Sequence, residues 1–277
     1  MSRHFTRFAT RRIAAVLAAA TLTAPLAVGF SAQAAMAATV DRTMPDARIN
    51  ESSGLTFSTR FTGAVITHND SGDGNRVFVV GRDGQTKAVW TLQGARSWDW
   101  EDIASTPDHT IWVGDIGDNF LRKDSQFVFA FTEPTSLRDA TVRPTAYEFV
   151  YPDGRSHNAE ALMVRPTNNR ILIVTKSKAG GAIYRFPANP SSTRPNVLEY
   201  MAPAPSTITA GAVAPSGGGF VLRSYSAAYV YDTPTSDPRR FPLPSLGESI
   251  TYGPSSTREV YSGSEGVRSN VWRVPIN

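Results

Sequence analysis

The chain has 277 residues, of which 41% are apolar, so it is long enough to bury a substantial core as a single domain. It contains no cysteine, which excludes disulfide-stapled folds, thiol catalysis and cysteine-bound metals. Four arginines in the first 37 residues account for the net charge of +4, so the remainder is neutral and gives no electrostatic reason to expect nucleic acid or an anionic membrane as a partner.

The first 37 residues combine a basic start, an apolar run over residues 13–30 and small residues at Ala35-Met36-Ala37. This order is typical of a cleaved export signal. The alternative, an uncleaved membrane anchor, is disfavoured by Pro25 within a short, alanine-rich run. We therefore expect a secreted, extracellular protein without a transmembrane segment after cleavage, whose mature part, residues 38–277, is one domain and a monomer.

Short apolar runs separated by turn residues follow, and no segment has a sustained helical period. A polar or small pair followed by an aliphatic residue recurs five times. The aliphatic residues are Leu55, Ile103, Leu162, Val213 and Ile250, at intervals of 48, 59, 51 and 37 residues. Repeats of roughly 40 to 50 residues with about four strands each are typical of propeller blades. The sequence therefore predicts an all-β fold, a five-bladed β-propeller, with blades over residues 52–92, 101–151, 161–200, 212–243 and 249–274.

The fifth predicted blade has one strand fewer than the others, whereas a candidate strand at residues 46–49 precedes the first blade. Pairing of 46–49 with 271–274 supplies the missing strand. It also removes the exposed sheet edges, because the N-terminal strand then closes the ring.

The innermost strand of each blade lines the channel of a propeller, so residues at one register converge. That register predicts a metal-binding ring of Ser53, Glu101, Glu160 and Glu248, with either Gly211 or Thr209 from the fourth blade. Converging buried carboxylates need protons or a cation, and hard oxygen ligands favour Ca²⁺, with Mg²⁺ second. The alternative that stays open is that the glutamates cap loops or bind backbone amides at the blade entrances.

The loops between the second and third strands of the blades are expected on the same face as this ring. Asp70 and Asp115 are candidates for activating a water, and Lys176 and Arg223 for holding the anionic group that is attacked. Candidate ligand-binding residues are His68, Trp98, Trp100, Tyr225, Glu265 and Arg268. Acidic groups come from the first two blades and basic groups from the third and fourth, so the face is predicted to hold a metal on one side and an anion on the other. The alternative is turn chemistry alone.

Several of these strings resemble a family of exported bacterial β-propellers of unassigned function, over residues 46–277. They are Glu51-Ser52-Ser53-Gly54-Leu55, His68-Asn69-Asp70-Ser71-Gly72, Trp100-Glu101-Asp102-Ile103-Ala104, Gly114-Asp115-Ile116-Gly117-Asp118-Asn119, Ala159-Glu160-Ala161-Leu162 and Gly263-Ser264-Glu265-Gly266. This resemblance implies the fold and no activity.

More distantly, the ring resembles that of the five-bladed calcium-activated nucleotidases, or apyrases, in which a Ser, Glu, Glu, Ser, Glu series holds a channel calcium. Ser53, Glu101, Glu160 and Glu248 match four blades, and the fourth blade departs from the series. The Ser53-Gly54-Leu55 opening is also similar to esterase-like phytases. These resemblances imply a metal more than they imply nucleotide hydrolysis.

Two functions stay open from the sequence. One is a secreted propeller that binds an extracellular ligand, a partner or a small anionic molecule on its channel face, with Ca²⁺ in the channel. The other is a metal-dependent hydrolase of an anionic, phosphate-ester substrate. The first is the interpretation that we carry forward.

Overall fold

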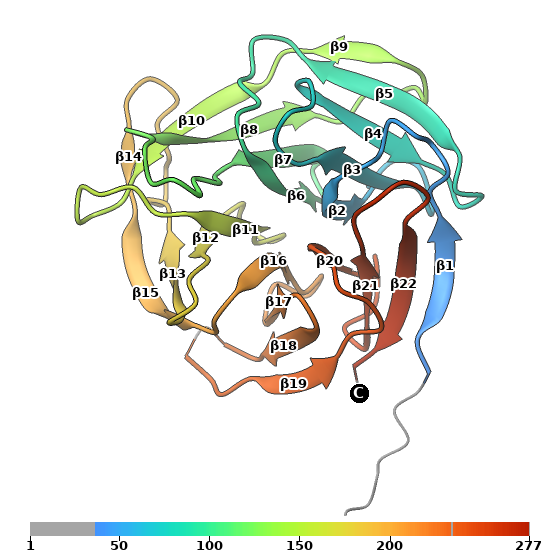
Figure 1. Cartoon of the computed structure of the whole chain (residues 1–277). Coiled ribbons are helices and arrows are strands. Elements are labelled where there is room, and N and C mark those ends of the chain that lie inside the picture. The colour runs from blue at the N-terminus through green and yellow to red at the C-terminus, as the bar shows by residue number, and fades with distance from the viewer. Residues whose placement is uncertain (1–36, 234, 277) are drawn as a thin grey trace, which may run out of the picture. The chain divides into compact units, whose positions relative to one another are not determined.

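A computed structural model describes residues 37–233 and 235–276. The predicted export signal, residues 1–37, lies outside the described residues apart from its last position. The described part is all β, and its sheets are arranged as the five blades of a propeller around a central channel (Figure 1). Within it, no helix is long and apolar enough to cross a membrane.

Each blade is a mainly antiparallel sheet whose strands follow chain order outward from the channel. The first blade contains β2 (Ser52–Phe57), β3 (Val65–Asn69), β4 (Arg76–Val80) and β5 (Thr86–Leu92). The second contains β6 (Trp100–Thr106), β7 (Thr110–Asp115), β8 (Gln126–Thr132) and β10 (Thr145–Val150). The third contains β11 (Ala159–Val164), β12 (Ile171–Thr175), β13 (Gly181–Arg185) and β15 (Glu199–Ala204). The fourth contains β16 (Ile208–Val213), β17 (Phe220–Ser224), β18 (Ala227–Tyr231) and β19 (Arg239–Pro242).

The fifth blade contains β20 (Ser249–Tyr252), β21 (Glu259–Gly263) and β22 (Asn270–Pro275), and β1 (Thr39–Thr43) completes it. The ring is therefore closed by an N-terminal strand, as predicted, but by an earlier one than 46–49. Thr39 pairs with Arg273 and Thr43 with Asn270. Residues 46–49 form a turn instead, in which the Ile49 N–H donates to the Asp46 carbonyl at 3.0 Å and the Arg48 side chain binds the Asp46 carboxylate.

Short strands also link neighbouring blades. The segment β9 (Ala140–Val142), which lies between β8 and β10 of the second blade, pairs in parallel with β5 of the first. In the same way β14 (Asn196–Val197), from the third blade, pairs with β10 of the second. These additions cover outer sheet edges that are otherwise open to pairing with other chains.

Five apolar clusters fill the spaces between blades, one for each neighbouring pair. Leu55, Ile103, Leu162 and Ile250 are buried in these clusters, as the repeat predicts.

The fourth blade differs, because Gly211 stands two residues after a β-bulge, where the second and third blades have Ile103 and Leu162. A Cβ on Gly211 would lie 2.9 Å from Leu222 Cδ2 and 3.0 Å from Met163 Cγ, so these larger side chains replace the missing aliphatic one. Val213, which the pattern selected, is therefore two residues out of register.

Candidate functional site

The innermost strands start at one mouth of the channel, and β-bulges interrupt four of them there. The extra residue is Glu101 in β6, Glu160 in β11 and Thr209 in β16, and in β2 it falls within the pair Ser53-Gly54. A bulged residue leaves the ladder and its side chain is re-aimed. The bulges therefore resolve the fourth-blade register in favour of Thr209 over Gly211.

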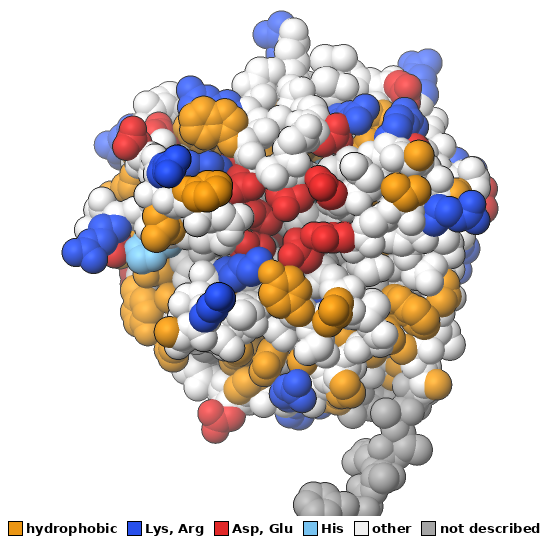
Figure 2. All heavy atoms as spheres, in the orientation of Figure 1, with side chains coloured by type: hydrophobic (Ala, Val, Ile, Leu, Met, Phe, Trp, Pro, Cys, Tyr) orange, Lys and Arg blue, Asp and Glu red, His pale blue; other side chains and the backbone are white. Residues whose placement is uncertain are grey.

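Three glutamates converge at this mouth. Glu101 and Glu160 are bulged, Glu248 directly precedes β20, and all three are buried. Each offers a carboxylate oxygen such that these oxygens lie within 4.8 Å of one another. We call these three residues the glutamate ring. Figure 2 shows acidic side chains gathered at the centre of the face on which the blades converge.

A second layer of carboxylates surrounds the glutamate ring. Asp70, at the end of β3, groups with Glu248 and Glu265, and it also groups with Asp99 and Glu101, again within 4.8 Å in each group. Six carboxylates therefore meet at this mouth. Gly117, in the loop after β7, makes room for them, because a Cβ there would collide with Glu101 Oε1 and lie 2.5 Å from Asp99 Oδ2.

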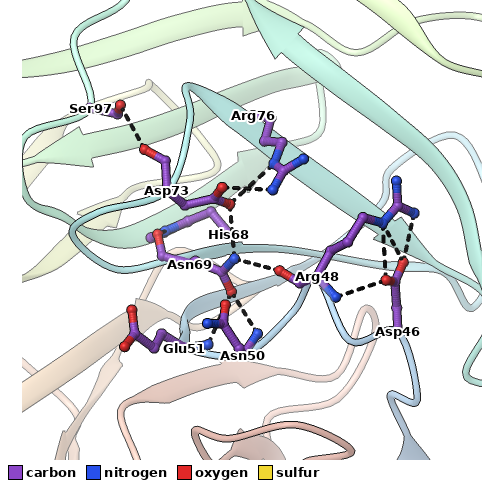
Figure 3. A network of polar contacts seen from close by, with 9 residues as sticks. All are labelled: Asp46, Arg48, Asn50, Glu51, His68, Asn69, Asp73, Arg76 and Ser97. Atoms are coloured by element: carbon purple, nitrogen blue, oxygen red, sulfur yellow. Dashed lines mark hydrogen bonds and ion pairs between the residues drawn. The ribbon is translucent and has the colours of Figure 1, made fainter.

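A polar network around Asn69 ties the chain before β2 to the loop after β3 (Figure 3). Asn69 accepts from the N–H groups of Asn50 and Glu51 at 3.2 and 3.1 Å, and its amide donates to Asp73 Oδ2 at 2.8 Å. The Asp70 N–H donates to the Glu51 carbonyl at 2.9 Å. The chain entering β2 and the loop leaving β3 are thus tied together, which places Asp70 above the glutamate ring.

Lys176, directly after β12, is the cation that contacts the glutamate ring. Its Nζ lies 2.9 Å from Glu160 Oε1 and 3.9 Å from Glu248 Oε1, and 5.0 Å from the centroid of the Tyr225 ring. Asn158 also donates to Glu160 Oε1, at 3.0 Å. Glu101 has no comparable donor on its second oxygen, because Oε2 is buried without a hydrogen-bond partner among the described residues.

Electrostatics at this mouth disfavour full ionisation. Burial raises the pKa of Glu101 well above its ordinary value, and the neighbouring Glu160 and Asp70 raise it further. Burial also raises the pKa of Glu160, even though Lys176 and Asn158 oppose the rise. The pKa of Glu248 is raised to about 8, first by burial and then by Glu265. The pKa of Asp70 is also raised, to about 6, mainly by burial.

Burial and neighbouring groups shift the pKa of Lys176 in opposite directions. Burial lowers its pKa, but Glu160, Tyr225 and Glu248 together outweigh burial, so the pKa of Lys176 stays above its ordinary value. Lys176 is therefore a permanent cation at neutral pH, and the glutamate ring together with the surrounding carboxylates exceeds its charge.

Two of the predicted ring positions contribute hydroxyl groups that support the glutamates. Ser53 Oγ donates to the Glu101 carbonyl at 2.7 Å. Thr209 Oγ1 contacts the carbonyl of Gly247, the residue before Glu248, at 3.4 Å. Each hydroxyl therefore holds the glutamate-bearing segment of the next blade in place through its backbone.

Two other predicted catalytic residues are committed to structural contacts. Asp115 Oδ1 accepts from Lys123 Nζ at 2.9 Å and from the Asp99 N–H at 2.9 Å. Arg223 is fully buried, and its guanidinium donates to the carbonyls of Ser249 and Gly263 at 2.8 Å and of Ser245 at 3.0 Å. The Arg223 guanidinium therefore joins blades four and five, and its position does not allow it to hold an anion on the open face.

The predicted ligand-binding residues divide into a buried and an exposed group. His68 and Trp100 lie in the core, with 0% and 1% exposure, and their rings pack edge to face. With so little exposed surface, they are too deep for contact with a ligand on the open face. Trp98 and Tyr225 are exposed on the face, at 61% and 39%.

The remaining two candidates, Glu265 and Arg268, are exposed in the loop between β21 and β22. Only Glu265 belongs to the acidic cluster.

Sequence reasoning missed three residues of this region. Asp99 and Asn158 are members of the site, and each lies two residues before a bulged glutamate, a shared spacing that the repeat carries in the sequence. Asp102, one residue after Glu101, is also buried. Its carboxylate accepts from the N–H groups of Ile103, Leu162 and Gly211 at 2.9, 3.0 and 3.1 Å, and so ties three blades together.

No protein-family model matches the chain, and no curated protein matches it. Among solved structures, the major allergen Mala s 1 of Malassezia sympodialis is 11% identical, over 85% of this chain and 95% of that one, with a TM-score of 0.56. The PQQ-bound aldose sugar dehydrogenase of Streptomyces coelicolor is 10% identical, over 87% and 98%, with a TM-score of 0.51. A gluconolactonase of Xanthomonas campestris, XC5397, is 13% identical, over 85% and 89%, with a TM-score of 0.49. At identities this low, the two structures with TM-scores above 0.5 show a shared fold and nothing about activity.

Proposed function

We propose that this chain is a secreted β-propeller that binds Ca²⁺ in the glutamate ring and uses the bound cation to hold a ligand on the same face. The observation that carries the proposal is Glu101. Its Oε2 is buried without a partner, in a group where Glu160 and Glu248 also offer oxygens within 4.8 Å. Carboxylate oxygens are the hard ligands that Ca²⁺ prefers, and a flexible oxygen set suits Ca²⁺ better than Mg²⁺.

Repulsion among the carboxylates supports a cation at this place. Two unit charges 4.8 Å apart repel by about 3.5 kcal/mol at an effective dielectric constant of about 20. Lys176 compensates for one of the six carboxylates, and protons or a further cation must compensate for others. A divalent cation offsets two charges at once and is a partner for Glu101 Oε2, whereas each proton offsets one charge.

Calorimetric titration of the chelator-treated protein tests the proposal. We expect Ca²⁺ to bind, Mg²⁺ to bind more weakly, and the melting temperature to rise with Ca²⁺ concentration by mass action. Glu101→Gln should weaken Ca²⁺ binding by about tenfold or more, which is about 1.4 kcal/mol. The matched control is Glu199→Gln, because Glu199 is an exposed glutamate of β15 that pairs with Arg185. Absence of both heat and thermal stabilisation with millimolar Ca²⁺ would refute the proposal.

The second candidate function is metal-dependent hydrolysis of a phosphate ester, and the placement of Asp70 favours it. Asp70 belongs to both outer acidic groups, so its carboxylate lies beside the glutamate ring, where it can orient a water next to a bound cation. Assays on nucleotides, sugar phosphates and phytate with Ca²⁺ test this candidate. We expect Asp70→Asn to abolish turnover without abolishing Ca²⁺ binding, and no turnover on any of these esters leaves binding as the function.

A further inference from the structure

A cavity of about 640 Å³ lies beside the acidic mouth, at the ends of β12 and β17 and the start of β13. Its wall includes Lys176, Lys178, His157, Asn158, Tyr184 and Tyr225. None of the described residues that line it is an aspartate or a glutamate. Two lysines and no carboxylate in the lining favour an anionic ligand over a cationic one.

Lys176 contacts the glutamate ring and also lines the cavity. Its ammonium lies against Glu160 and Glu248 of the glutamate ring, while the residue also lines the cavity together with Tyr225, whose ring it faces. A lysine side chain is a compact charge on a flexible four-carbon stem, so the ammonium can turn between two nearby partners without a backbone change. In this structure it serves as the counter-ion of the glutamates.

A divalent cation in the glutamate ring changes this balance. Such a cation would have Glu160 and Glu248 as ligands and would repel the ammonium, because like charges repel strongly in a partly buried site. Lys176 would then lose its two anionic contacts, and its side chain already lines the cavity.

We infer that the cavity binds a small organic anion, a carboxylate or phosphate carried on a ring, and that cation binding strengthens this site by releasing Lys176 into it. The inference rests on the proposed Ca²⁺ site. Lys178 supplies a second positive charge, and the exposed ring of Tyr225 supplies the surface for the ring of the ligand. Because binding free energies are reciprocal, the anion strengthens Ca²⁺ binding by the same factor.

Phenyl phosphate and benzoate are suitable probes, since each carries one acidic group on a ring, and benzyl alcohol is their neutral counterpart. Calorimetric titrations of each probe are run with chelator and with saturating Ca²⁺. We expect at least one anionic probe to bind, and to bind more tightly with Ca²⁺ by a factor within the usual range of about 5 to 150 for coupled sites. Benzyl alcohol should show no such dependence.

Three variants separate the roles of the lysines. Lys176→Met should keep Ca²⁺ binding and reduce the Ca²⁺-dependent gain in probe affinity to about onefold, because the transferable charge is gone. Lys178→Met should weaken the anionic probes in both conditions but preserve the gain from Ca²⁺. Lys87→Met, at an exposed lysine of β5 that pairs with Asp83, is the matched control and should behave as the wild type.

The outcomes distinguish the two proposals. If the wild type does not bind Ca²⁺, the proposed function fails. If it binds Ca²⁺ but no anionic probe, or binds the probes equally well with and without Ca²⁺, the proposed function stands and the coupled anion site is overturned. A gain that persists in Lys176→Met also overturns it, since the probe then contacts the cation without help from Lys176.

Discussion

The two mouths of the channel are built by the same five innermost strands and differ in chemistry. Where the strands start, six carboxylates and Lys176 meet. Where they end, a cavity of about 540 Å³ has no charged residue among those that line it, and its wall consists mainly of hydroxyl-bearing residues, prolines and the rings of Phe57 and Tyr252. The lining of a channel mouth in this fold can therefore be free of charged side chains. The charges at the other mouth need a different explanation from ring closure.

Two adjacent residues of β6 show the same contrast at shorter range. Asp102 and Glu101 are both buried carboxylates. Asp102 accepts three backbone N–H groups from three blades, which is how a structural buried carboxylate is normally satisfied. Glu101 leaves Oε2 without a partner and faces other carboxylates. A buried carboxylate whose oxygens accept hydrogen bonds from backbone N–H groups has a structural role. A buried carboxylate oxygen without a hydrogen-bond partner indicates a binding role.

Removal of the closing strand should have the largest effect, because both mouths depend on a closed ring. Deleting residues 38–44 removes β1, the buried Met44, and the buried Arg42 guanidinium that donates to the carbonyls of Gly63, Val80 and Gly81. We expect the free energy of unfolding to fall by about 5 kcal/mol or more, from lost burial and unpaired ladder groups. Denaturant unfolding measures this, and an unchanged transition would show that β1 does not close the ring.

The contrast between Asp102 and Glu101 can be tested in chelator-treated protein. Asp102→Ala leaves the buried N–H groups of Leu162 and Gly211 without acceptors, so we expect a loss of about 3 kcal/mol and a fall in melting temperature of about 6 to 12 °C. Glu101→Gln removes a repelled carboxylate and should leave stability unchanged or raise it. Equal losses in the two variants would break the distinction between structural and binding carboxylates.

The acidic mouth should also make stability depend on pH. The pKa of Glu248 is raised to about 8 in the folded protein from an ordinary value of 4.5, so between these values the folded state holds a proton that the unfolded state has lost. Stability therefore falls as pH rises through this window. Burial lowers the pKa of His68 to about 4, so His68 is neutral in the folded protein above about pH 4 and in the unfolded chain above about pH 6.5. Above about pH 6.5 it is neutral in both states and does not oppose the trend.

We expect the melting temperature without metal to decrease by several degrees between about pH 6.5 and pH 8. Saturating Ca²⁺ should remove most of this decrease, because the cation stabilises the ionised carboxylates. Thermal melts with chelator and with Ca²⁺ give the measurement, and Glu248→Gln is the variant in which the slope should flatten. A slope of the opposite sign would contradict the raised pKa.

The smallest effect is expected at the uncharged mouth. Tyr252→Phe removes one hydroxyl group from the wall of that cavity and keeps the buried ring, so stability should change by about 1 kcal/mol or less. Calcium affinity should be unchanged, since the residue lies at the opposite end of β20 from Glu248. A large change in calcium affinity would show that the two mouths are coupled.

Much of the fold was predictable from the sequence by itself. An aliphatic position that recurs five times between turn residues predicts five blades, because each blade must bury the same kind of face against its neighbours. Four of the five positions, Leu55, Ile103, Leu162 and Ile250, are buried in the predicted register. The register that this repeat defines also brings Glu101, Glu160 and Glu248 together. Such local periodicity is encoded within each repeat and needs no knowledge of distant contacts.

Tertiary structure alone decided the rest. The choice of Thr39–Thr43 over 46–49 as the closing strand depends on pairing with β22, more than 200 residues away in the chain. Contacts between blades also determine three features of the site. One is the bulge at Thr209, and another is the burial of Trp100 and Arg223 away from the open face. The third is the position of Lys176 between the glutamates and a cavity. Residue type and spacing do not carry this information, because burial and ion pairing depend on which distant side chains share a space, and that is set only when the ring closes.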